Sequence, residues 1–562
     1  MNTKCQLRWL FVAQAVLLAI AGWRNVHQLN PDAIAYLRIA GYYAAGQVEL
    51  AVTGYWGPLL SWLMVPLLKA GVAPLLAARV VMAGAGVVFL AGSLAVFRAF
   101  RLPPVSTVVG ASVVAGYSVF WSVRNITPDL LMAGLVALAV SATVRLFLSP
   151  GQRTQGAATA SCRRGGVGRL SIVAGAWWGV AYLAKAVALP LAVLTTLALA
   201  GLALRRRAEL RREVAQRLGL LGLGAALVAG PWVGMLSLHY GKFTFSTTGP
   251  IAHALAGPGA AARYHPAMVT LHQPEVGRLT QWEEPSRMAY RLWSPFASAE
   301  HFQHQLAVMQ RNVATLTDWL WGVRWLSGAE DSRGAVRMLP GFDLLGASLA
   351  GVFGGVVVLF VSRRRPRRVR WSWAVVPVVG LAGLYLPFWV QPEDQRYFYG
   401  ALPFVWVLVL GSWRWVCEQG WDWTKRIRQR VFRVAGVAFV IPAALWLGVG
   451  IWGIPNAANR MAHALAAQLK VQGQSGPLAG SAALSGGRTG LYTAFHLGER
   501  WLGDDVHAGP ADFELLGTRT VVLLRGSRQA EAFGRSVHWR RLEAADGVVP
   551  VVVFLRTAAE LR

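Results

Sequence analysis

Long apolar stretches recur along most of this chain, and they constrain its fold more than any single motif does. A bilayer core of about 30 Å needs roughly 20 apolar residues per helix. With 55% hydrophobic and only 14% charged residues, the chain is predicted to be a polytopic all-α membrane bundle rather than a soluble protein. Eleven spans are expected near residues 9–25, 77–97, 103–121, 128–148, 171–184, 186–204, 218–238, 343–361, 371–390, 401–416 and 434–453. Lys185 and Pro190 favour a break between the fifth and sixth spans.

The distribution of basic residues predicts the topology. The net charge of +29 would suggest nucleic-acid binding in a soluble protein, but here lysine and arginine gather in alternate connections. These groups lie within 4–8, 98–101, 153–169, 205–217, 363–370 and 425–433. All six fall on one side if the N-terminus is cytoplasmic, as the positive-inside rule requires. We therefore expect a multi-pass protein of the cytoplasmic (inner) membrane, with its C-terminus outside and no nucleic-acid partner.

The predicted outer side holds three long segments, near 26–76, 239–342 and 454 to the end. In the first, DAIAYLRIAGYYAAG predicts an amphipathic helix along the membrane interface, with Asp32 and Tyr36 on one face. A short helix opened by Pro58 follows. We expect a transmembrane domain over 1–455 and a small extracytoplasmic α/β domain over 456–562. Its predicted elements are helices at 457–470, 486–497 and 526–534 and strands at 520–524 and 548–555.

Residues 2–22 also resemble a signal peptide, but an uncleaved anchor is preferred because it would hold Asp32 at the membrane surface. All three cysteines fall on the cytoplasmic side, which argues against an extracytoplasmic disulfide. His301 and His304 have the i, i+3 spacing of metal ligands on a helix. No third ligand recurs at a fixed offset, so a divalent metal remains an alternative that is not favoured, and no cofactor is expected.

Several short motifs occur in order along the membrane part. Asp32, Tyr36, Ile39 and Ala40 fit most of a D-E-x-x-Y-x-x-I-A pattern after the first span. The later matches are WGPLLSWL, Arg79 in AARVVMAG, Arg124 with Thr127, Asp129 and Leu131, the segment AYLAKAVALP, and EDQRYFYGALP. This order resembles the C-type glycosyltransferases of the protein mannosyltransferase and lipid A aminoarabinose transferase superfamily.

The resemblance implies a membrane enzyme that moves a sugar from a polyprenyl-phosphate donor to a hydroxyl group of a glycan, lipid or protein. The chain departs from the family pattern at Ala33, where the family has a second acid. That substitution puts a metal-binding or shared-proton role of the acidic pair in doubt. It leaves Asp32 as the acid at this point, with Glu49 the nearest other candidate.

Such a transfer needs a base for the hydroxyl proton and cations for the departing phosphate. Asp32 is the expected base, since a carboxylate at a partly dry interface can gain basicity. Lys185 and Arg396 are the expected phosphate ligands, and Arg124 could assist. The supporting residues are Tyr36, Glu49, Asp129 and Tyr397.

Each of these residues also has a structural alternative. Asp32 could be a simple interfacial acid, and Asp129 could cap or begin the fourth span. Lys185 could snorkel or pair with an acid, and Arg396 could pair with Glu393 or Asp394.

Two other classes of protein compete with the enzyme. A membrane transporter or flippase of a lipid-linked or small polar substrate would also contain intramembrane charges and helices broken by proline. A non-catalytic scaffold would not require Asp32, Arg124, Lys185 and Arg396 together near the outer half of the bundle. The absence of a visible internal repeat and the large asymmetric outer segments favour an enzyme.

Overall fold

The structure of the chain is a computed structural model. It describes residues 2–148, 157–206, 211–259, 264–321, 371–388, 395–418, 440, 443–453, 457–480, 488–542 and 551–557. The predicted span at 343–361 and the acids Glu393 and Asp394 lie outside the described residues.

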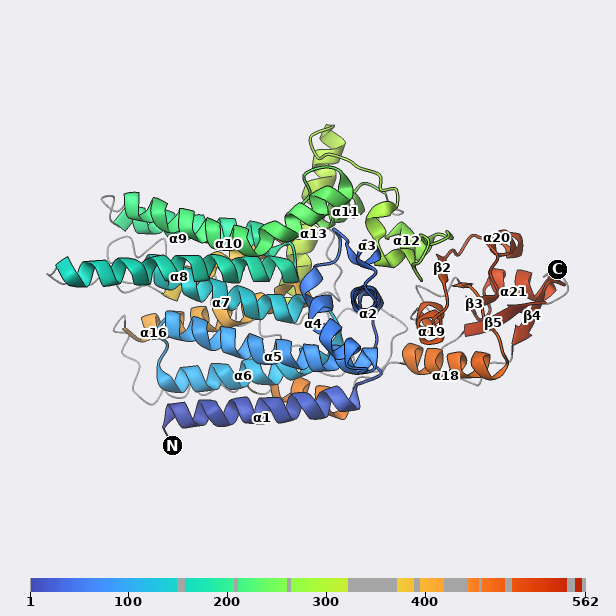
Figure 1. The fold of residues 1–562 in the computed structure, drawn as a ribbon, viewed down its shortest axis with the longest axis horizontal. Coiled ribbons are helices and arrows are strands. Elements are labelled where there is room, and N and C mark those ends of the chain that lie inside the picture. The colour runs from blue at the N-terminus through green and yellow to red at the C-terminus, as the bar shows by residue number, and fades with distance from the viewer. Residues whose placement is uncertain are drawn as a thin grey trace.

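Among the described residues, seven helices are long and apolar enough to cross a membrane, and they run side by side (Figure 1). These are α1 (Thr3–Arg24), α5 (Pro74–Ala99), α6 (Pro104–Arg124), α7 (Asp129–Leu148), α8 (Ala157–Ala184), α9 (Ala188–Arg206) and α10 (Arg211–Tyr240). They match the first seven predicted spans. The expected break is present, because α8 ends at Ala184 and α9 begins at Ala188 with Lys185 between them.

The later apolar segments are shorter where they are described. The stretch at 371–390 holds η7 (Trp371–Ala374) and α15 (Val375–Tyr385), and the next holds η8 (Gln395–Ala401) and α16 (Leu402–Glu418). The last predicted span corresponds to a helix over Ala443–Trp452. The fold is thus a polytopic membrane bundle, and the number of eleven spans stays a prediction.

Successive spans alternate in direction, which separates the two ends of the bundle. One end of the bundle lies away from the C-terminal region (Figure 1). The first residues of α1 and α10 and the last residues of α5 lie at this end. Lys4, Arg98 and Arg211 therefore belong to the same end, as the charge pattern predicted. The assignment of that end to the cytoplasm remains a prediction.

Helix α5 touches α7, and α8 touches α10, at glycines. A Cβ on Gly134 of α7 would come within 2.7 Å of the backbone nitrogen of Phe89 in α5. A Cβ on Gly224 of α10 would collide with the carbonyl oxygen of Ile172 in α8. Small residues let membrane helices pack backbone to backbone, which matters because lipid provides little hydrophobic driving force between helices.

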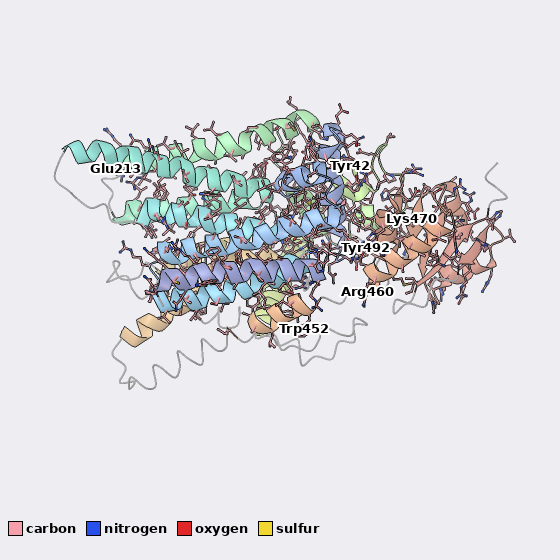
Figure 2. The ribbon with its side chains drawn as sticks, turned by 60° about the horizontal axis from the view of Figure 1, so that its bottom comes forward. Tyr42, Glu213, Trp452, Arg460, Lys470 and Tyr492 are labelled. Carbon is pink, nitrogen blue, oxygen red and sulfur yellow. The ribbon has the colours of Figure 1, made fainter. Side chains whose placement is uncertain are left out.

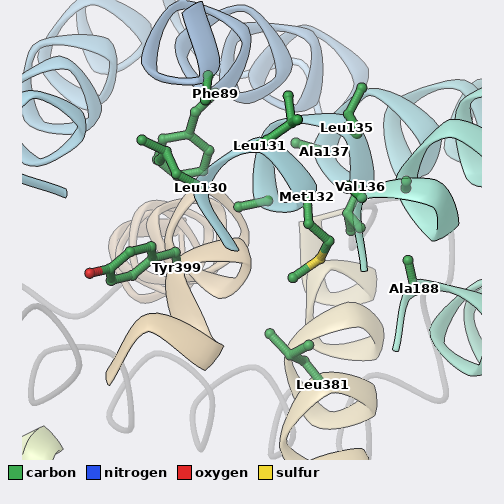
Figure 3. Packing of buried hydrophobic residues seen from close by; sticks show 14 of the residues in the cluster. Phe89, Leu130, Leu131, Met132, Leu135, Val136, Ala137, Ala188, Leu381 and Tyr399 are labelled. Carbon is green, nitrogen blue, oxygen red and sulfur yellow. The ribbon is translucent and has the colours of Figure 1, made fainter. Parts of the chain in front are cut away.

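α7 lies at the centre of the core. Its apolar side chains face four other elements, as Figure 3 shows for Phe89 of α5, Ala188 of α9, Leu381 of α15 and Tyr399 of η8. This packing brings the first turn of α7, the break before α9 and η8 together.

Three short helices connect α1 with α5: α2 (Pro31–Ala44), α3 (Val48–Ala51) and α4 (Pro58–Lys69). Pro58 begins α4, as expected of a residue that lacks the N–H group a first helical turn leaves unbonded. Figure 1 shows α2 end-on, across the direction of the spans, and its position along the membrane interface stays a prediction. No residue from Gln28 to Ala44 is exposed, because α4, η3 and α19 pack around the helix.

The segment after α10 contains α11 (Thr248–Leu255), α12 (Pro266–Val269), η3 (Gln281–Glu283), η4 (Pro285–Arg287) and α13 (Ala299–Trp321). We call its stretch 264–288 the outer loop. The outer loop packs on α2, since the hydroxyl of Tyr42 donates to Glu283 at 2.6 Å. The indole of Trp56, just before α4, donates to the carbonyl of Trp282 at 3.0 Å.

The C-terminal region, residues 457–557, contains a five-stranded sheet with the order β2-β1-β3-β5-β4. The strands are β1 (Leu478–Gly480), β2 (Trp501–Asp504), β3 (Thr520–Leu524), β4 (Trp539–Leu542) and β5 (Val551–Arg556). β1 pairs in parallel with β2 and β3, and β5 pairs antiparallel with β3 and β4. The helices are α18 (Ala457–Val471), α19 (Thr489–Leu497), α20 (Pro510–Leu515) and α21 (Arg528–Arg535). All five predicted elements are present, whereas β1, β2, β4 and α20 were not predicted.

The outer loop is hydrogen-bonded to strand β2 of this sheet. Trp501 donates its N–H to the carbonyl of Leu279 at 2.7 Å, and His272 donates its N–H to the carbonyl of Leu502 at 2.9 Å. Figure 2 shows Tyr42 of the bundle and Tyr492 of α19 at this junction, far from Glu213 at the other end of the bundle. The C-terminal region is therefore tied to the same side of the bundle as α2.

Candidate active site

Asp32 lies in the first turn of α2. The helix begins at Pro31, and Asn30 precedes it in an extended conformation. The side-chain oxygen of Asn30 accepts a hydrogen bond from the N–H of Ile126 at 2.9 Å, which ties the start of α2 to the turn between α6 and α7. A carboxylate is favoured here by the partial positive charge of a helix N-terminus.

Arg396 forms an ion pair with Asp32 although 364 residues separate them in the chain. One guanidinium nitrogen lies 2.6 Å from a carboxylate oxygen, and the two side chains are 16% and 17% exposed. Arg396 belongs to η8, immediately before α16. The described structure therefore assigns Arg396 a partner other than the Glu393 or Asp394 weighed from the sequence.

Lys185 forms a second ion pair, with Asp129. Its Nζ atom lies 2.5 Å from a carboxylate oxygen of Asp129, whose side chain is only 1% exposed. Asp129 is the first residue of α7, so the structural alternatives for both residues are realised: Asp129 begins the fourth span, and Lys185 pairs with an acid. The side chain of Lys185 is still 22% exposed, so the lysine stays a predicted phosphate ligand.

Tyr397 joins the two ion pairs. Its ring centre lies 4.4 Å from Nζ of Lys185 and 5.4 Å from Cζ of Arg396, distances that allow cation–π attraction to both. The ring of Tyr385 stacks on it at 4.7 Å between ring centres and fixes its orientation. We call Asp32, Asp129, Lys185, Arg396 and Tyr397 the charge cluster; its two acids and two cations sum to zero charge.

The other predicted site residues differ in their placement. Tyr36 is buried beside the charge cluster: burial raises the pKa of its hydroxyl, and the charges of Asp129 and Asp32 raise it further. Glu49 is exposed on α3, and none of the ion pairs among the described residues includes it. The guanidinium of Arg124 lies over the ring of Phe120 at 5.8 Å.

His265 of the outer loop was not predicted as a site residue. Its Nε2 atom lies 3.1 Å from the hydroxyl of Tyr55, and its Nδ1 atom lies 3.2 Å from the hydroxyl of Tyr290. Burial lowers the pKa of His265 to about 4, with Asp32 opposing that shift. The imidazole is thus neutral at pH 7 and lies within the electrostatic range of Asp32. Nothing in the sequence distinguishes His265 from the other ten of the eleven histidines.

A pair of buried acids braces the outer loop against α2 and α10. Glu283 accepts from Tyr42, and Arg38 lies 3.6 Å from its carboxylate. The hydroxyl of Tyr240, at the end of α10, lies 3.2 Å from Glu284. Burial raises the pKa of Glu284 to about 7. These contacts hold the outer loop against α2 and the end of α10.

No group of three histidine, cysteine or acidic side chains in the described part of the chain is placed to hold a metal ion. The two histidines weighed as ligands bind backbone carbonyls instead. His304 contacts the carbonyl of Ala256 at 2.8 Å, and His301 contacts that of Ser294 at 3.1 Å.

Comparison with protein-family models and with curated sequences finds no match. Solved structures are similar. An apo oligosaccharyltransferase from Archaeoglobus fulgidus superposes with a TM-score of 0.54 at 12% identity, covering 92% of this chain and 69% of that one. The archaeal oligosaccharyltransferase AglB from Archaeoglobus fulgidus, in complex with an inhibitory peptide and a dolichol-phosphate, gives 0.50 at 13% identity with the same coverage. ArnT from Cupriavidus metallidurans gives 0.46 at 17% identity over 99% of both chains.

The first two similarities extend through the membrane bundle and most of the chain. They confirm the resemblance inferred from the ordered motifs at the level of fold: the chain has the fold of C-type membrane glycosyltransferases. The roles of the individual residues remain predictions.

Proposed function

We propose that the protein is a membrane glycosyltransferase that moves a sugar from a polyprenyl-phosphate donor to a hydroxyl group of a glycan, lipid or protein acceptor. The observation that carries the proposal is the charge cluster, which brings an acid and two cations together from α2, the break before α9 and η8. The similar archaeal oligosaccharyltransferase in complex with a dolichol-phosphate supports a lipid-linked donor.

The chemistry follows from the charges. The acceptor hydroxyl attacks the anomeric carbon of the sugar, and the bond from that carbon to the phosphate oxygen breaks. Its electron pair leaves with the phosphate, whose growing negative charge Arg396 and Lys185 stabilise. The carboxylate of Asp32 accepts the hydroxyl proton.

We propose that this reaction takes place at the outer face of the cytoplasmic membrane, in the following topology. It comprises eleven spans, a cytoplasmic N-terminus, a transmembrane domain over 1–455 and an extracytoplasmic domain over 456–562. The support is the common end of the bundle for Lys4, Arg98 and Arg211, opposite the C-terminal region. Exposed Trp23 at the end of α1 and Trp452 fit an interfacial aromatic belt on the side of the C-terminal region.

The test is transfer by purified protein incubated with lipid extracts, with the products identified by mass spectrometry. Asp32→Asn should lower the rate by about 10²-fold or more while the protein stays folded and still binds donor lipid. Glu49→Gln is the matched control, because Glu49 is a nearby but exposed acid, and it should leave the rate unchanged. Near wild-type turnover of Asp32→Asn would show that Asp32 is structural.

The role of Arg396 in holding the donor phosphate is tested by replacing its guanidinium group. Arg396→Lys keeps the charge but loses the fork of donors, so it should weaken donor use as Arg396→Ala does, though less. Equal kinetics for both variants and wild type would remove Arg396 from the donor site. Uptake of radiolabelled sugar into vesicles, without any transfer in detergent, would instead identify a transporter.

A further inference from the structure

Arg488 brings a basic side chain from the C-terminal region to its junction with the bundle. It directly precedes α19, which packs against α2, the helix that carries Asp32. Tyr492, one turn further along α19, marks this junction in Figure 2.

Hydrogen bonds connect the C-terminal region, which carries Arg488, to α2 through the outer loop. The hydrogen bonds from Trp501 to Leu279 and from His272 to Leu502 tie the sheet to the outer loop. The outer loop is in turn bonded to α2 through Tyr42. The C-terminal region and α2 are thus joined within the described chain.

The backbone of Arg488 is left-handed, with φ 64° and ψ 31°. Arg101 is the only other non-glycine residue of the described chain with a positive φ. Glycine adopts this backbone conformation without strain, whereas the Cβ atom of any other residue makes it unfavourable. Strained residues of this kind occur where their side chains are needed, typically at binding and active sites.

The guanidinium of Arg488 has a hydrogen-bond donor that is not used within the described structure. Its Nη1 atom is buried and has no hydrogen-bond partner in the described structure, and no described acid forms an ion pair with it. A buried polar group without a partner is rare in folded proteins and is typically satisfied by a ligand, ion or water. An anion with several oxygens suits a guanidinium best.

The charges of Arg488 and Asp32 both affect the pKa values of His265 and Tyr492. Burial lowers the pKa of His265; Asp32 raises it and Arg488 lowers it. Burial raises the pKa of Tyr492, Arg488 lowers it and Asp32 raises it. Both charges thus act on the same two side chains, one from the outer loop and one from α19.

We propose that Arg488 binds a phosphate oxygen of the polyprenyl-phosphate lipid, as a third cation beside Arg396 and Lys185. The inference rests on the proposed function. The charge cluster alone is neutral, because each of its cations has an acidic partner. Arg488 gives the site the net positive charge that an anionic ligand needs, so the C-terminal region forms part of the donor site and does not merely cover it.

The test compares binding of decaprenyl phosphate and of uncharged decaprenol to the full-length protein, measured by native mass spectrometry in detergent. Arg488→Gly should weaken decaprenyl phosphate binding about tenfold, as expected for loss of a charge-assisted hydrogen bond, and should not change decaprenol binding. Because glycine suits the left-handed backbone, the apparent Tm should stay equal or rise. Arg488→Lys should give an intermediate affinity.

Arg101→Gly is the matched control, since Arg101 has the same backbone conformation (φ 60°) in the turn between α5 and α6. It should keep the wild-type affinity for decaprenyl phosphate. If Arg488→Gly binds decaprenyl phosphate as tightly as wild type, the inference fails while the proposed function stands. If wild type itself prefers neither lipid and transfers no sugar, both are overturned.

Discussion

Removal of Lys185 should reveal how much the buried acid Asp129 depends on its partner. The carboxylate is 1% exposed and lies 2.5 Å from Nζ of Lys185, whose side chain is 22% exposed. Breaking a buried ion pair by removing one partner costs about 3–5 kcal/mol, because the remaining charge is left without compensation. Since water can reach Lys185, the lower end applies, and Lys185→Met should destabilise the protein by about 3 kcal/mol.

The double variant Lys185→Met with Asp129→Leu separates charge from packing. With both charges gone, no uncompensated carboxylate remains, and the loss should fall to about 1 kcal/mol or less. The double variant should then be about 2 kcal/mol more stable than Lys185→Met alone. Lys69→Met, which changes an exposed lysine at the end of α4, should have no measurable effect.

The assay is thermal unfolding of the three variants and wild type in one detergent, read by tryptophan fluorescence, together with donor binding. The double variant should regain stability without regaining donor affinity if Lys185 also holds the phosphate. Wild-type stability of Lys185→Met would refute the argument from buried charge. A double variant as unstable as the single one would show that packing, not charge, dominates.

Three further outcomes are expected. Gly224→Ala should destabilise the contact of α8 with α10 by about 1–3 kcal/mol through overpacking, whereas Gly222→Ala, which meets open space, should not; equal unfolding temperatures would contradict the close approach. Burial raises the pKa of Glu284 from 4.5 to about 7, so its carboxyl ionises at lower pH in the unfolded state than in the folded one. The free energy of unfolding should therefore fall by on the order of 3 kcal/mol as pH rises from 4.5 to 7. Glu284→Gln should flatten this fall in pH-dependent unfolding, and an unchanged profile would assign the fall to other groups. In intact spheroplasts an impermeant maleimide should label Arg500→Cys but not native Cys162, and labelling of Cys162 would reverse the topology.

The fold was predictable where it depends on composition along the chain. Apolar length and alternate basic connections located seven described spans, and Lys185 marked the break between α8 and α9. Strands as short as β1, with three residues, carry too little periodicity to be recognised. The burial of α2 was missed because its amphipathic pattern does not show that α19, from the far end of the sequence, covers it.

Most residues of the candidate site could be named from the sequence, but the ion pair between Asp32 and Arg396 could not. Sequence reasoning singled out Asp32 and Arg396, yet weighed only nearby acids as partners for Arg396. Their contact depends on how α2 and η8 meet, which no local pattern encodes. Glu49 was nominated by its distance along the chain from Asp32, and the turn after α2 leaves it exposed. Arg488 lies in a glycine-rich stretch that reads as an ordinary turn.

The hydrogen bonds between the outer loop and β2 also bear on how a polypeptide could be recognised. Proteins often bind an extended peptide by adding it as an extra strand to an open sheet edge. The backbone groups of Trp501 and Leu502 are already bonded to Leu279 and His272, so the β2 edge is capped by the protein itself. Strand addition would be left to β4, at the opposite edge of the sheet and separated from α2 by its full width. If the proposed transfer takes place at Asp32, its acceptor would therefore not be held by β-augmentation at that edge.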